Sequence, residues 1–508
     1  MKNFYLTTPI YYVNDRPHIG HAYTSLACDI IARFKRMDGY NVKFLTGTDE
    51  HGQKVEKSAK EKNIDTQLFT DETARYFQEL TKIMGYSQDD FIRTTEERHK
   101  KTARYFWNIL KEKGFIYKDK YAGWYAVRDE AYYNEDELVS GKAPTGADVE
   151  WMEEESYFFK LSAFQDKLLK FYDENPEFIA PKSRYNEVVS FVRGGKEYKK
   201  SALKDLSISR TSFSWGVKVP NDENHVIYVW LDALTNYLSA LNFSESNSDF
   251  TKFWPADLHM VGKDILRFHA VYWPAFLMAA GLALPKRIFA HGWWTNEGEK
   301  ISKSLGNVIN PIELVENYGL DQVRFFLMRQ VTFGNDGDFS KNDLITRVNS
   351  DLANNYGNLA QRTLAMVQKN CQAKIPEYKL NSKDQEILNY AYDKFTDLQN
   401  FINRQNFSRY LEEIIDISAK ANEYIDKEAP WVLRKEDPAR MNTVLYVLLE
   451  LIRVISLYFL PVMNNSANKI LDFLAVNNKN RNFSNIKTIL ISGQKLPAPE
   501  AVFPRIAE

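Results

Sequence analysis

The sequence predicts an α/β fold, in which a doubly wound parallel sheet carries an inserted domain and is followed by an all-helical domain. Two observations predict it. Short runs of aromatic and β-branched residues, typical of strands, alternate with amphipathic helical patterns from residue 4 to residue 298. From residue 344 onward almost every segment has a helical period instead. This change of period indicates a mixed sheet-and-helix part followed by a part made of helices alone.

The first strand, turn and helix form the unit around which the rest is arranged. Residues 4–8 have the composition of a strand, and apolar residues recur at helical spacing over 26–37. Between them, His18 and His21 stand at i and i+3 where the helix begins, with Gly20 between them. Both imidazoles then share a helix N-terminus, where N–H groups and the dipole favour anions, and Gly20 allows a nucleotide to approach closely. The pattern indicates a nucleotide phosphate site; the alternative is two histidines that only cap the helix.

A second polar stretch follows a strand-like run near residue 290. It reads Glu299, Lys300, Ile301, Ser302, Lys303 and Ser304. On its own such a segment is most often a solvated loop. Together with His18 and His21, it resembles the paired signatures of class I aminoacyl-tRNA synthetases, in which each half of a split nucleotide-binding fold carries one.

Composition and charge narrow the classes of protein. The chain has 508 residues, enough for about two to four domains. Its formal net charge is −1, so a nucleic-acid partner must be bound by local patches and shape. Cys28 and Cys371 lie far apart, which suits a reducing compartment and offers no disulfide framework. There is no signal-peptide pattern, and apolar runs such as 275–284 fall short of the roughly 20 residues of a membrane span. We expect a cytoplasmic protein without a membrane segment.

Polar residues also follow the second strand pattern, at 42–46. Asp49, Glu50 and His51 come after it, where parallel α/β folds place ligand-binding groups. The alternative is a capped turn, with Asp49 as the N-cap of a helix over 54–62.

The character of the chain changes between residues 116 and 225. Short aromatic strands and a lysine-rich loop over 194–202 predict an inserted domain there. The sheet resumes with a buried-strand pattern at 226–230, then strands at 258–261 and 288–290. We expect five units: a first Rossmann-like half at 1–115, the inserted domain at 116–225, a second Rossmann-like half at 226–298, a linker with the lysine–serine loop at 299–343, and a helical domain at 344–508.

Six pieces of sequence resemble those of one class I family, the methionyl-tRNA synthetases, and the resemblance covers essentially the full chain. They are 8–14 (TPIYYVN), 47–52 (GTDEHG), 91–96 (FIRTTE), 228–233 (YVWLDA), 262–265 (GKDI) and 300–304 (KISKS). The resemblance implies a split Rossmann-like fold with a helical anticodon-binding domain. It also implies a methionine–tRNA ligase, which activates L-methionine with ATP to methionyl-adenylate and transfers methionyl to tRNA(Met), the initiator included, for translation.

The resemblance further implies a methionine pocket, made by Ile10, Tyr12, Trp230, Tyr237, Ile265, His269 and Trp273, with Asp49 and Asp264 holding the ammonium group. The residue types fit a thioether, because a polarizable sulfur favours aromatic walls and a carboxylate binds ammonium through charge-assisted hydrogen bonds. Without the resemblance, the aromatic residues would be interpreted as core packing.

For the nucleotide, the resemblance implies that His18, His21, Lys300 and Lys303 stabilise phosphate charge during the reaction, with Arg210 near the active site. The residues implied for ATP binding are Asn14, His18, Gly20, His21, Lys300, Ser302 and Lys303. Mg²⁺ would accompany ATP, and the work of the protein would be placement and charge stabilisation.

In the helical part, Asn358 and Arg362 stand at i and i+4 and share one helix face. Trp431, after Pro430, offers a stacking plane for an unstacked base. The resemblance implies that these three residues read the CAU anticodon. The alternative is an exposed helix face and a buried tryptophan.

Three departures from the family bear on cofactors and partners. Where many members carry zinc-binding Cys-x-x-Cys knuckles, this chain has Ala126, Asp129 and Ala143, so we expect no structural zinc. The loop over 196–202 looks like an extra surface piece without an assigned function. No dimerising β-barrel follows the helical pattern, so we expect a monomer.

Two other functions remain open from the sequence. A synthetase for isoleucine or valine would carry a much larger editing insertion than 116–225. A catalytically silent tRNA-binding regulator would not need His18, His21, Lys300 and Lys303. ATP–pyrophosphate exchange with each amino acid distinguishes all three.

Overall fold

The centre of the α/β part is a sheet of parallel strands. The computed structural model describes residues 1–13, 16–128, 131–133, 135–246, 249–301 and 308–507. In sheet order the strands are β3 (Asp90–Arg93), β2 (Asn41–Asp49), β1 (Asn3–Tyr12), β12 (Leu258–Gly262), β13 (Ile288–His291) and β7 (Ile179–Ala180). All neighbouring pairs are parallel, with Leu6 opposite Leu258. The strand order reverses between β1 and β12, which is where a doubly wound sheet binds its ligand.

Alternation along the strands divides the α/β part into two cores. Tyr5 and Leu45 enter one core, whereas their neighbours Leu6 and Phe44 enter the other, because successive side chains of a strand point to opposite faces. The first core also contains residues of α4 (Glu97–Glu112), α5 (Gln165–Glu174), α6 (Lys182–Arg193), α7 (Val229–Ser239) and α9 (Trp273–Ala280). The second contains α1 (Ile19–Met37) and α11 (Leu320–Arg329). The sheet is therefore covered by helices on both faces.

The stretch predicted as an insertion forms an antiparallel sheet and also contributes one strand and its flanking helices to the parallel sheet region. One sheet orders β5 (Ala131–Tyr133), β4 (Ile116–Ala126), β6 (Glu150–Phe159) and β8 (Leu206–Ser207). However, β7 from the same stretch pairs with β13 in the parallel sheet, and α5 and α6 flank it. Two residues of strand are too short to give a sequence signal, so this contribution was not expected. The domain boundaries themselves stay predictions.

The predicted strand at 226–230 is wrong in extent and in partner. Strand β11 (Asp222–Ile227) ends earlier, and helix α7 already begins at Val229, so Trp230 lies on a helix. β11 pairs antiparallel with β9 (Ser209–Arg210) and β10 (Lys218–Val219), outside the parallel sheet. Apolar side chains at Leu231, Leu234 and Leu238 are buried at helical spacing, a period that the adjoining strand residues obscured.

The remaining elements around the sheet are short. Between β2 and β3 lie α2 (Gln53–Glu61) and α3 (Thr66–Ile83), and α8 (Phe250–Phe253) precedes β12. A 3-10 turn at Lys263–Ile265 and a π-helical turn at Phe268–Tyr272 precede α9. After the sheet, β15 (Glu299–Lys300), β14 (Trp294–Asn296) and β16 (Gly337–Phe339) form a small sheet, and α10 (Pro311–Tyr318) lies between them in sequence.

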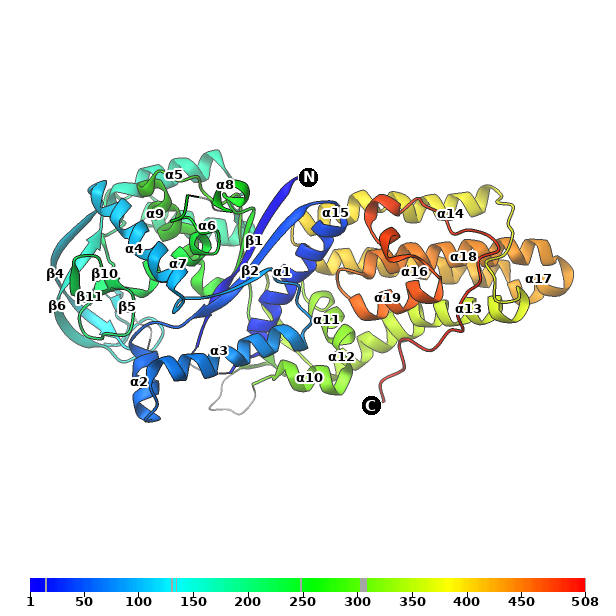
Figure 1. Cartoon of the computed structure of the whole chain (residues 1–508), viewed down its shortest axis with the longest axis horizontal. Coiled ribbons are helices and arrows are strands. Elements are labelled where there is room, and N and C mark those ends of the chain that lie inside the picture. Colours follow the sequence, from blue (N-terminus) through cyan, green and yellow to red (C-terminus); the bar gives the residue numbers. More distant parts are fainter. Residues whose placement is uncertain (14–15, 129–130, 134, 247–248, 302–307, 508) are drawn as a thin grey trace.

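The C-terminal part is helical, as the period predicts, and extends away from the sheet (Figure 1). It contains α12 (Lys341–Arg347), a π-helical stretch Val348–Gly357, α13 (Asn358–Asn370), α14 (Ser382–Asp393), α15 (Phe395–Asn403), α16 (Phe407–Glu428), α17 (Pro430–Glu436), α18 (Pro438–Phe459) and α19 (Asn464–Phe473). Its core is continuous with the core around α1. The two parts therefore share buried apolar surface.

Helix α18 corrects the expectation that apolar runs are too short for a membrane span. Among the described residues it is the one helix long and apolar enough to cross a membrane, and 94% of its most apolar window is buried inside the molecule. Glu450 and Arg453 of α18 form a buried ion pair. The helix forms the centre of the helical part. A helix that is buried on all sides by its neighbours is apolar all round, which explains its high mean hydropathy.

Candidate active site

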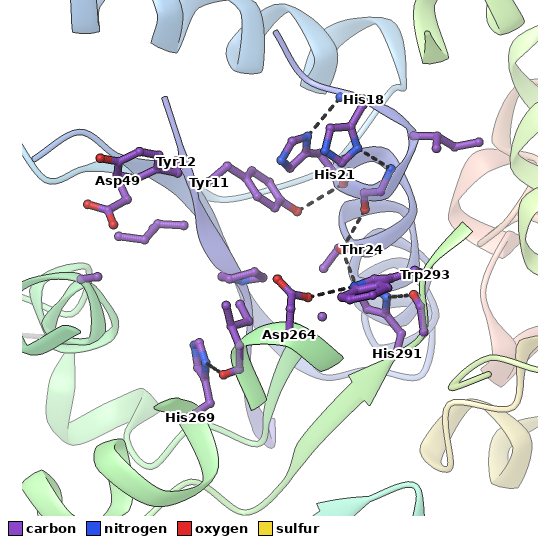
Figure 2. Close-up of a pocket in the computed structure, with 18 of the residues that line it drawn as sticks. Tyr11, Tyr12, His18, His21, Thr24, Asp49, Asp264, His269, His291 and Trp293 are labelled. Atoms are coloured by element: carbon purple, nitrogen blue, oxygen red, sulfur yellow. Dashed lines mark hydrogen bonds between the residues drawn. The ribbon is translucent and has the colours of Figure 1, made fainter. Parts of the chain in front are cut away.

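A cavity of about 680 Å³ lies at the carboxyl ends of β1, β2, β12 and β13, at the switch point of the sheet. Figure 2 draws 18 of the residues that line it. The register of β1 against β2 shifts between Thr7 and Ile10, around Pro9, which lacks a backbone N–H. This irregularity precedes Ile10 and Tyr12, two of the residues that line the cavity.

The two predicted histidines form a reciprocal cap at the start of α1. His18 is the N-cap residue, and its Nδ1 accepts a hydrogen bond from the Gly20 N–H at 3.1 Å. The His18 N–H donates in turn to Nδ1 of His21, also at 3.1 Å. Because both Nδ1 atoms accept, each neutral ring carries its proton on Nε2. The capping alternative is thus real, and it leaves one N–H donor on each ring.

Burial keeps these imidazoles neutral. It lowers the pKa of His18, and it lowers the pKa of His21 well below its ordinary value, with His18 adding to the effect. The His21 ring packs edge-on against Tyr11 at 4.8 Å and Phe77 at 5.3 Å, centroid to centroid. The Tyr11 hydroxyl also contacts Ser25 at 2.7 Å and donates to the His21 carbonyl. The cavity therefore meets two fixed, uncharged N–H donors at a helix N-terminus.

Helix α7 supplies an aromatic wall. Trp230, Ala233, Leu234 and Tyr237 line the cavity at i, i+3, i+4 and i+7, which places them on one face. The indole of Trp230 stacks on Phe268, with centroids 3.3 Å apart and planes at 13°. Trp230 is thereby fixed by the π-helical turn that faces α7.

A hydrogen-bonded pair extends this wall. Nδ1 of His269 donates to the Ile265 carbonyl at 3.0 Å, so Nε2 is free to accept from the Tyr237 hydroxyl at 2.7 Å. Burial lowers the pKa of His269 to about 4. The pair presents an uncharged, mostly apolar surface near neutral pH.

Two carboxylates line the cavity from different strands. Asp49 is the last residue of β2, and Asp264 follows β12. Asp264 accepts a hydrogen bond from the indole N–H of Trp293 at 3.2 Å. The predicted residues Ile10, Tyr12, Trp230, Tyr237, Ile265 and His269 line the same cavity, as do His18, Gly20 and His21.

Two predicted site residues do not line the cavity. Trp273 is buried behind Tyr237, with ring centroids 5.9 Å apart, and its indole donates to Nε2 of His259. Arg210 lies in β9, buried, with its guanidinium carbon 3.6 Å from the centre of the Tyr228 ring and an Nη1 donor on the Ser209 carbonyl. β9 belongs to the separate antiparallel sheet, and Arg210 is not among the residues that line the cavity.

Several expected residues lie outside the described ones. These are Asn14, Ser302, Lys303 and the side chain of Lys300. Their flanks are described: Ile301 and Val308 both line the cavity.

Five further residues that line the cavity were not predicted from the sequence: Lys54, Thr24, His291, Trp293 and Trp294. Nε2 of His291 is 2.7 Å from the Thr24 hydroxyl, which links the end of β13 to α1. A His-Gly pair at the carboxyl end of β13 was a signal that could have identified His291.

In the helical part, the three predicted anticodon residues come together. Asn358 is the first residue of α13 and is exposed, one turn before Arg362. The guanidinium carbon of Arg362 is 5.4 Å from the centre of the Trp431 ring on α17, and Arg362 pairs with Asp426 at 3.2 Å. Trp431 is 44% exposed, which contradicts the buried-tryptophan alternative.

The reversed strand order, the histidine cap at the switch point and the appended helical part define a class I aminoacyl-tRNA synthetase. The family model described as "tRNA synthetases class I (M)" matches residues 4–364, and the one described as "Anticodon binding domain of methionyl tRNA ligase" matches residues 375–508. The chain belongs to the methionyl-tRNA synthetase family.

Relatives agree along the whole chain. A methionine–tRNA ligase of Rickettsia felis is 58% identical over 515 residues, which cover 99% of both chains. One of Rhizobium meliloti is 52% identical, covering 99% of this chain and 98% of its own. Mycobacterium tuberculosis methionyl-tRNA synthetase in complex with methionyl-adenylate superposes with a TM-score of 0.95 at 49% identity, covering 99% of this chain and 100% of that one. The apo form of the Mycobacterium tuberculosis enzyme superposes with a TM-score of 0.90 at 46% identity, covering 100% of this chain and 99% of that one.

Proposed function

We propose that this chain is a methionine–tRNA ligase, which joins L-methionine to tRNA(Met) in two steps at the switch-point cavity. A methionine carboxylate oxygen attacks the α-phosphorus of ATP, and pyrophosphate leaves as methionyl-adenylate forms. The ribose hydroxyl at the end of the tRNA then attacks the carbonyl carbon, and AMP leaves. The observation that carries the proposal is the cavity itself, in which an aromatic wall, two carboxylates and two N–H donors converge. The solved relative that superposes with it is described with methionyl-adenylate.

The aromatic wall suits the methionine side chain. Trp230 and Tyr237 offer polarizable faces to a thioether, and His269 is neutral because burial lowers its pKa to about 4. Asp49 and Asp264 would hold the ammonium group, since a carboxylate in a partly closed site binds it by charge-assisted hydrogen bonds. Ile10, Tyr12 and Ile265 complete the proposed pocket.

The helix cap suits the phosphates. The Nε2–H groups of His18 and His21 lie at the positive end of the α1 dipole, and these donors need no reorganisation when charge develops on phosphate oxygens. Lys300 and Lys303, with Asn14, Gly20 and Ser302, are proposed to bind ATP on the strength of the sequence motifs. Mg²⁺ would enter with ATP and neutralise its phosphate oxygens.

The helical part is proposed to read the CAU anticodon. Trp431 is exposed and has a guanidinium against its ring, an arrangement in which a base can stack and be hydrogen-bonded. Asn358 adds donor and acceptor groups on the same face. Charging of initiator and elongator tRNA(Met) would follow from the same anticodon.

ATP–pyrophosphate exchange with each of the twenty amino acids tests the function. We expect exchange with methionine, and a loss of about 10²-fold or more in His21→Ala and in Lys303→Ala without a change in methionine binding. Exchange with isoleucine or valine instead would support the related synthetases, and no exchange with any amino acid would support a silent tRNA-binding regulator.

We further propose that the protein holds no structural zinc. Two of the knuckle positions, Ala126 and Ala143, pack with Ala147 as a small buried apolar cluster, which offers no donor atoms. The stretch 116–224 contains neither Cys nor His. Chelator-washed protein should retain its exchange activity, and elemental analysis should find no zinc; one tightly held zinc per chain would contradict the proposal.

Localisation and assembly are also proposals. Membership of a translation enzyme family supports a cytoplasmic location. We propose a monomer, and light scattering of purified protein checks it: a dimer mass would refute this.

A further inference from the structure

A carboxylate is buried between two histidines behind the aromatic wall. Asp232 of α7 accepts from Nδ1–H of His51 at 2.7 Å and from Nε2–H of His99 at 2.7 Å. All three side chains are buried. Burial alone would raise the pKa of Asp232, but the two imidazoles hold it below its usual range. A buried carboxylate persists only when donors satisfy it, and here each oxygen has one.

The network joins the two walls of the methionine pocket from behind. His51 lies two residues after Asp49, the carboxylate at the end of β2. Asp232 lies two residues after Trp230 and five before Tyr237, on the helix that carries the aromatic wall. None of the three network residues is among those that line the cavity.

We infer that Asp232 is a positioning residue for methionine: its bond to His51 sets the distance between the ammonium-binding Asp49 and the aromatic wall of α7. The inference rests on the proposed function, because it assigns the residue to methionine and not to ATP. His99, on α4, anchors the other carboxylate oxygen, and its Nδ1 is 3.1 Å from the Ser239 hydroxyl of α7. The carboxylate is thereby held from two elements, and α7 cannot turn without breaking a bond to one of them.

The geometry limits the effect to one substrate. The ATP donors at the start of α1 are held by their own contacts with Tyr11, Gly20 and Phe77, which do not include Asp232. Loss of the network should therefore displace the methionine walls and leave the phosphate donors in place. A displacement of about 1 Å in a binding site can cost up to about 10²-fold.

The experiment measures KM for methionine and for ATP in pyrophosphate exchange, with thermal unfolding alongside. Asp232→Leu keeps the branching of the side chain and removes both acceptors; we expect KM for methionine to rise about tenfold or more while KM for ATP stays within about twofold. Asp232→Asn keeps one acceptor oxygen and should give a smaller rise. The control is Thr235→Val. Thr235 is buried on the same helix and its hydroxyl donates to the Leu231 carbonyl of that helix, so we expect wild-type constants.

Three results would overturn the inference. KM for methionine could stay at the wild-type value in both Asp232 variants. KM for both substrates could rise together, or kcat alone could fall in step with the melting temperature, which would indicate a merely structural role. If Asp232→Leu does not fold, the isosteric Asp232→Asn decides alone. Failure of the wild-type chain to catalyse methionine-dependent exchange would refute the proposed function instead.

Discussion

At the scale of one residue, the space around Gly20 explains why a glycine stands between His18 and His21. An added Cβ would lie 2.9 Å from Cε1 of His18, closer than real Cβ contacts come, and 3.1 Å from its Nδ1, tighter than most such contacts. The absence of a side chain at Gly20 allows a nucleotide to approach the backbone closely. The structure adds a second reason, namely that the His18 ring occupies this space.

Gly20→Ala should therefore displace the His18 ring and break its bond to the Gly20 N–H, while the helix itself gains propensity. We expect methionine-dependent exchange to fall about 10- to 100-fold with little change in melting temperature. Gly216→Ala is the control, since its Cβ would meet only the Val226 side chain, at 3.3 Å. Equal rates in the two variants would contradict the steric argument.

Buried neutral imidazoles also predict how stability depends on pH. Burial lowers the pKa of His18, His21, His259, His269 and His291. In the unfolded chain these groups titrate near pH 6.5, so below that pH the unfolded state binds more protons than the folded one. The free energy of unfolding should fall as pH drops from about 7 toward 4, by up to about 1.4 kcal/mol per pH unit for each such group.

Urea unfolding at pH 7.5 and pH 5.5 measures this dependence. His269→Gln, which removes one of the buried imidazoles, should reduce the difference between the two pH values. A free energy of unfolding that is unchanged, or larger at pH 5.5, would contradict the assignment of these rings as neutral.

At the scale of the element, α17 is a short helix that presents one indole to solvent. Trp431→Ala should leave pyrophosphate exchange unchanged, because an exposed side chain far from the cavity contributes little to the core. Aminoacylation of tRNA should fall at least about fivefold, since base stacking contributes about 1–3 kcal/mol. Val432→Ala is the matched control, because Val432 is the next residue, is 43% exposed and has no ring.

Comparison of the two activities decides this prediction. Equal losses of exchange and charging in Trp431→Ala would indicate a residue of structural importance. Equal losses of charging in Trp431→Ala and Val432→Ala would indicate that the surface, and not the ring, binds tRNA.

At the scale of the whole molecule, a buried arginine ties the α/β part to the helical part. Arg324 of α11 donates to Asp29 of α1 at 2.6 Å and to the carbonyls of Met84, Pro461 and Val462. Val462 follows α18, whereas Asp29 lies on the helix that begins with the histidine cap. The same apolar core extends across this junction.

Arg324→Met should lower the free energy of unfolding by about 3–5 kcal/mol, because it leaves the buried Asp29 carboxylate short of a partner. Scanning calorimetry measures the loss as a lower melting temperature. Arg347→Met removes a partly exposed ion pair with Asp351 and should cost less than about 1 kcal/mol. Similar decreases in melting temperature in both variants would show that Arg324 stabilises the fold no more than a partly exposed ion pair does.

The sequence by itself determined the local units and indicated several residues that line the cavity. The period-2 and period-3.6 patterns are local properties of neighbouring residues, so they predicted the α/β part and the helical part. The pattern at the start of the first helix predicted His18 and His21, and the family resemblance implied Trp230 and Tyr237; all four line one cavity.

Only the tertiary structure decided which distant elements meet. In the structure β7 lies at the edge of the sheet, and Arg210 and Trp273 do not line the cavity. His51 and His99 both bond to the buried carboxylate of Asp232. Pairing of short strands and satisfaction of buried polar groups depend on partners that are far apart in the chain. No local pattern records such partners, because their free energy comes from burial and hydrogen bonding in the folded molecule.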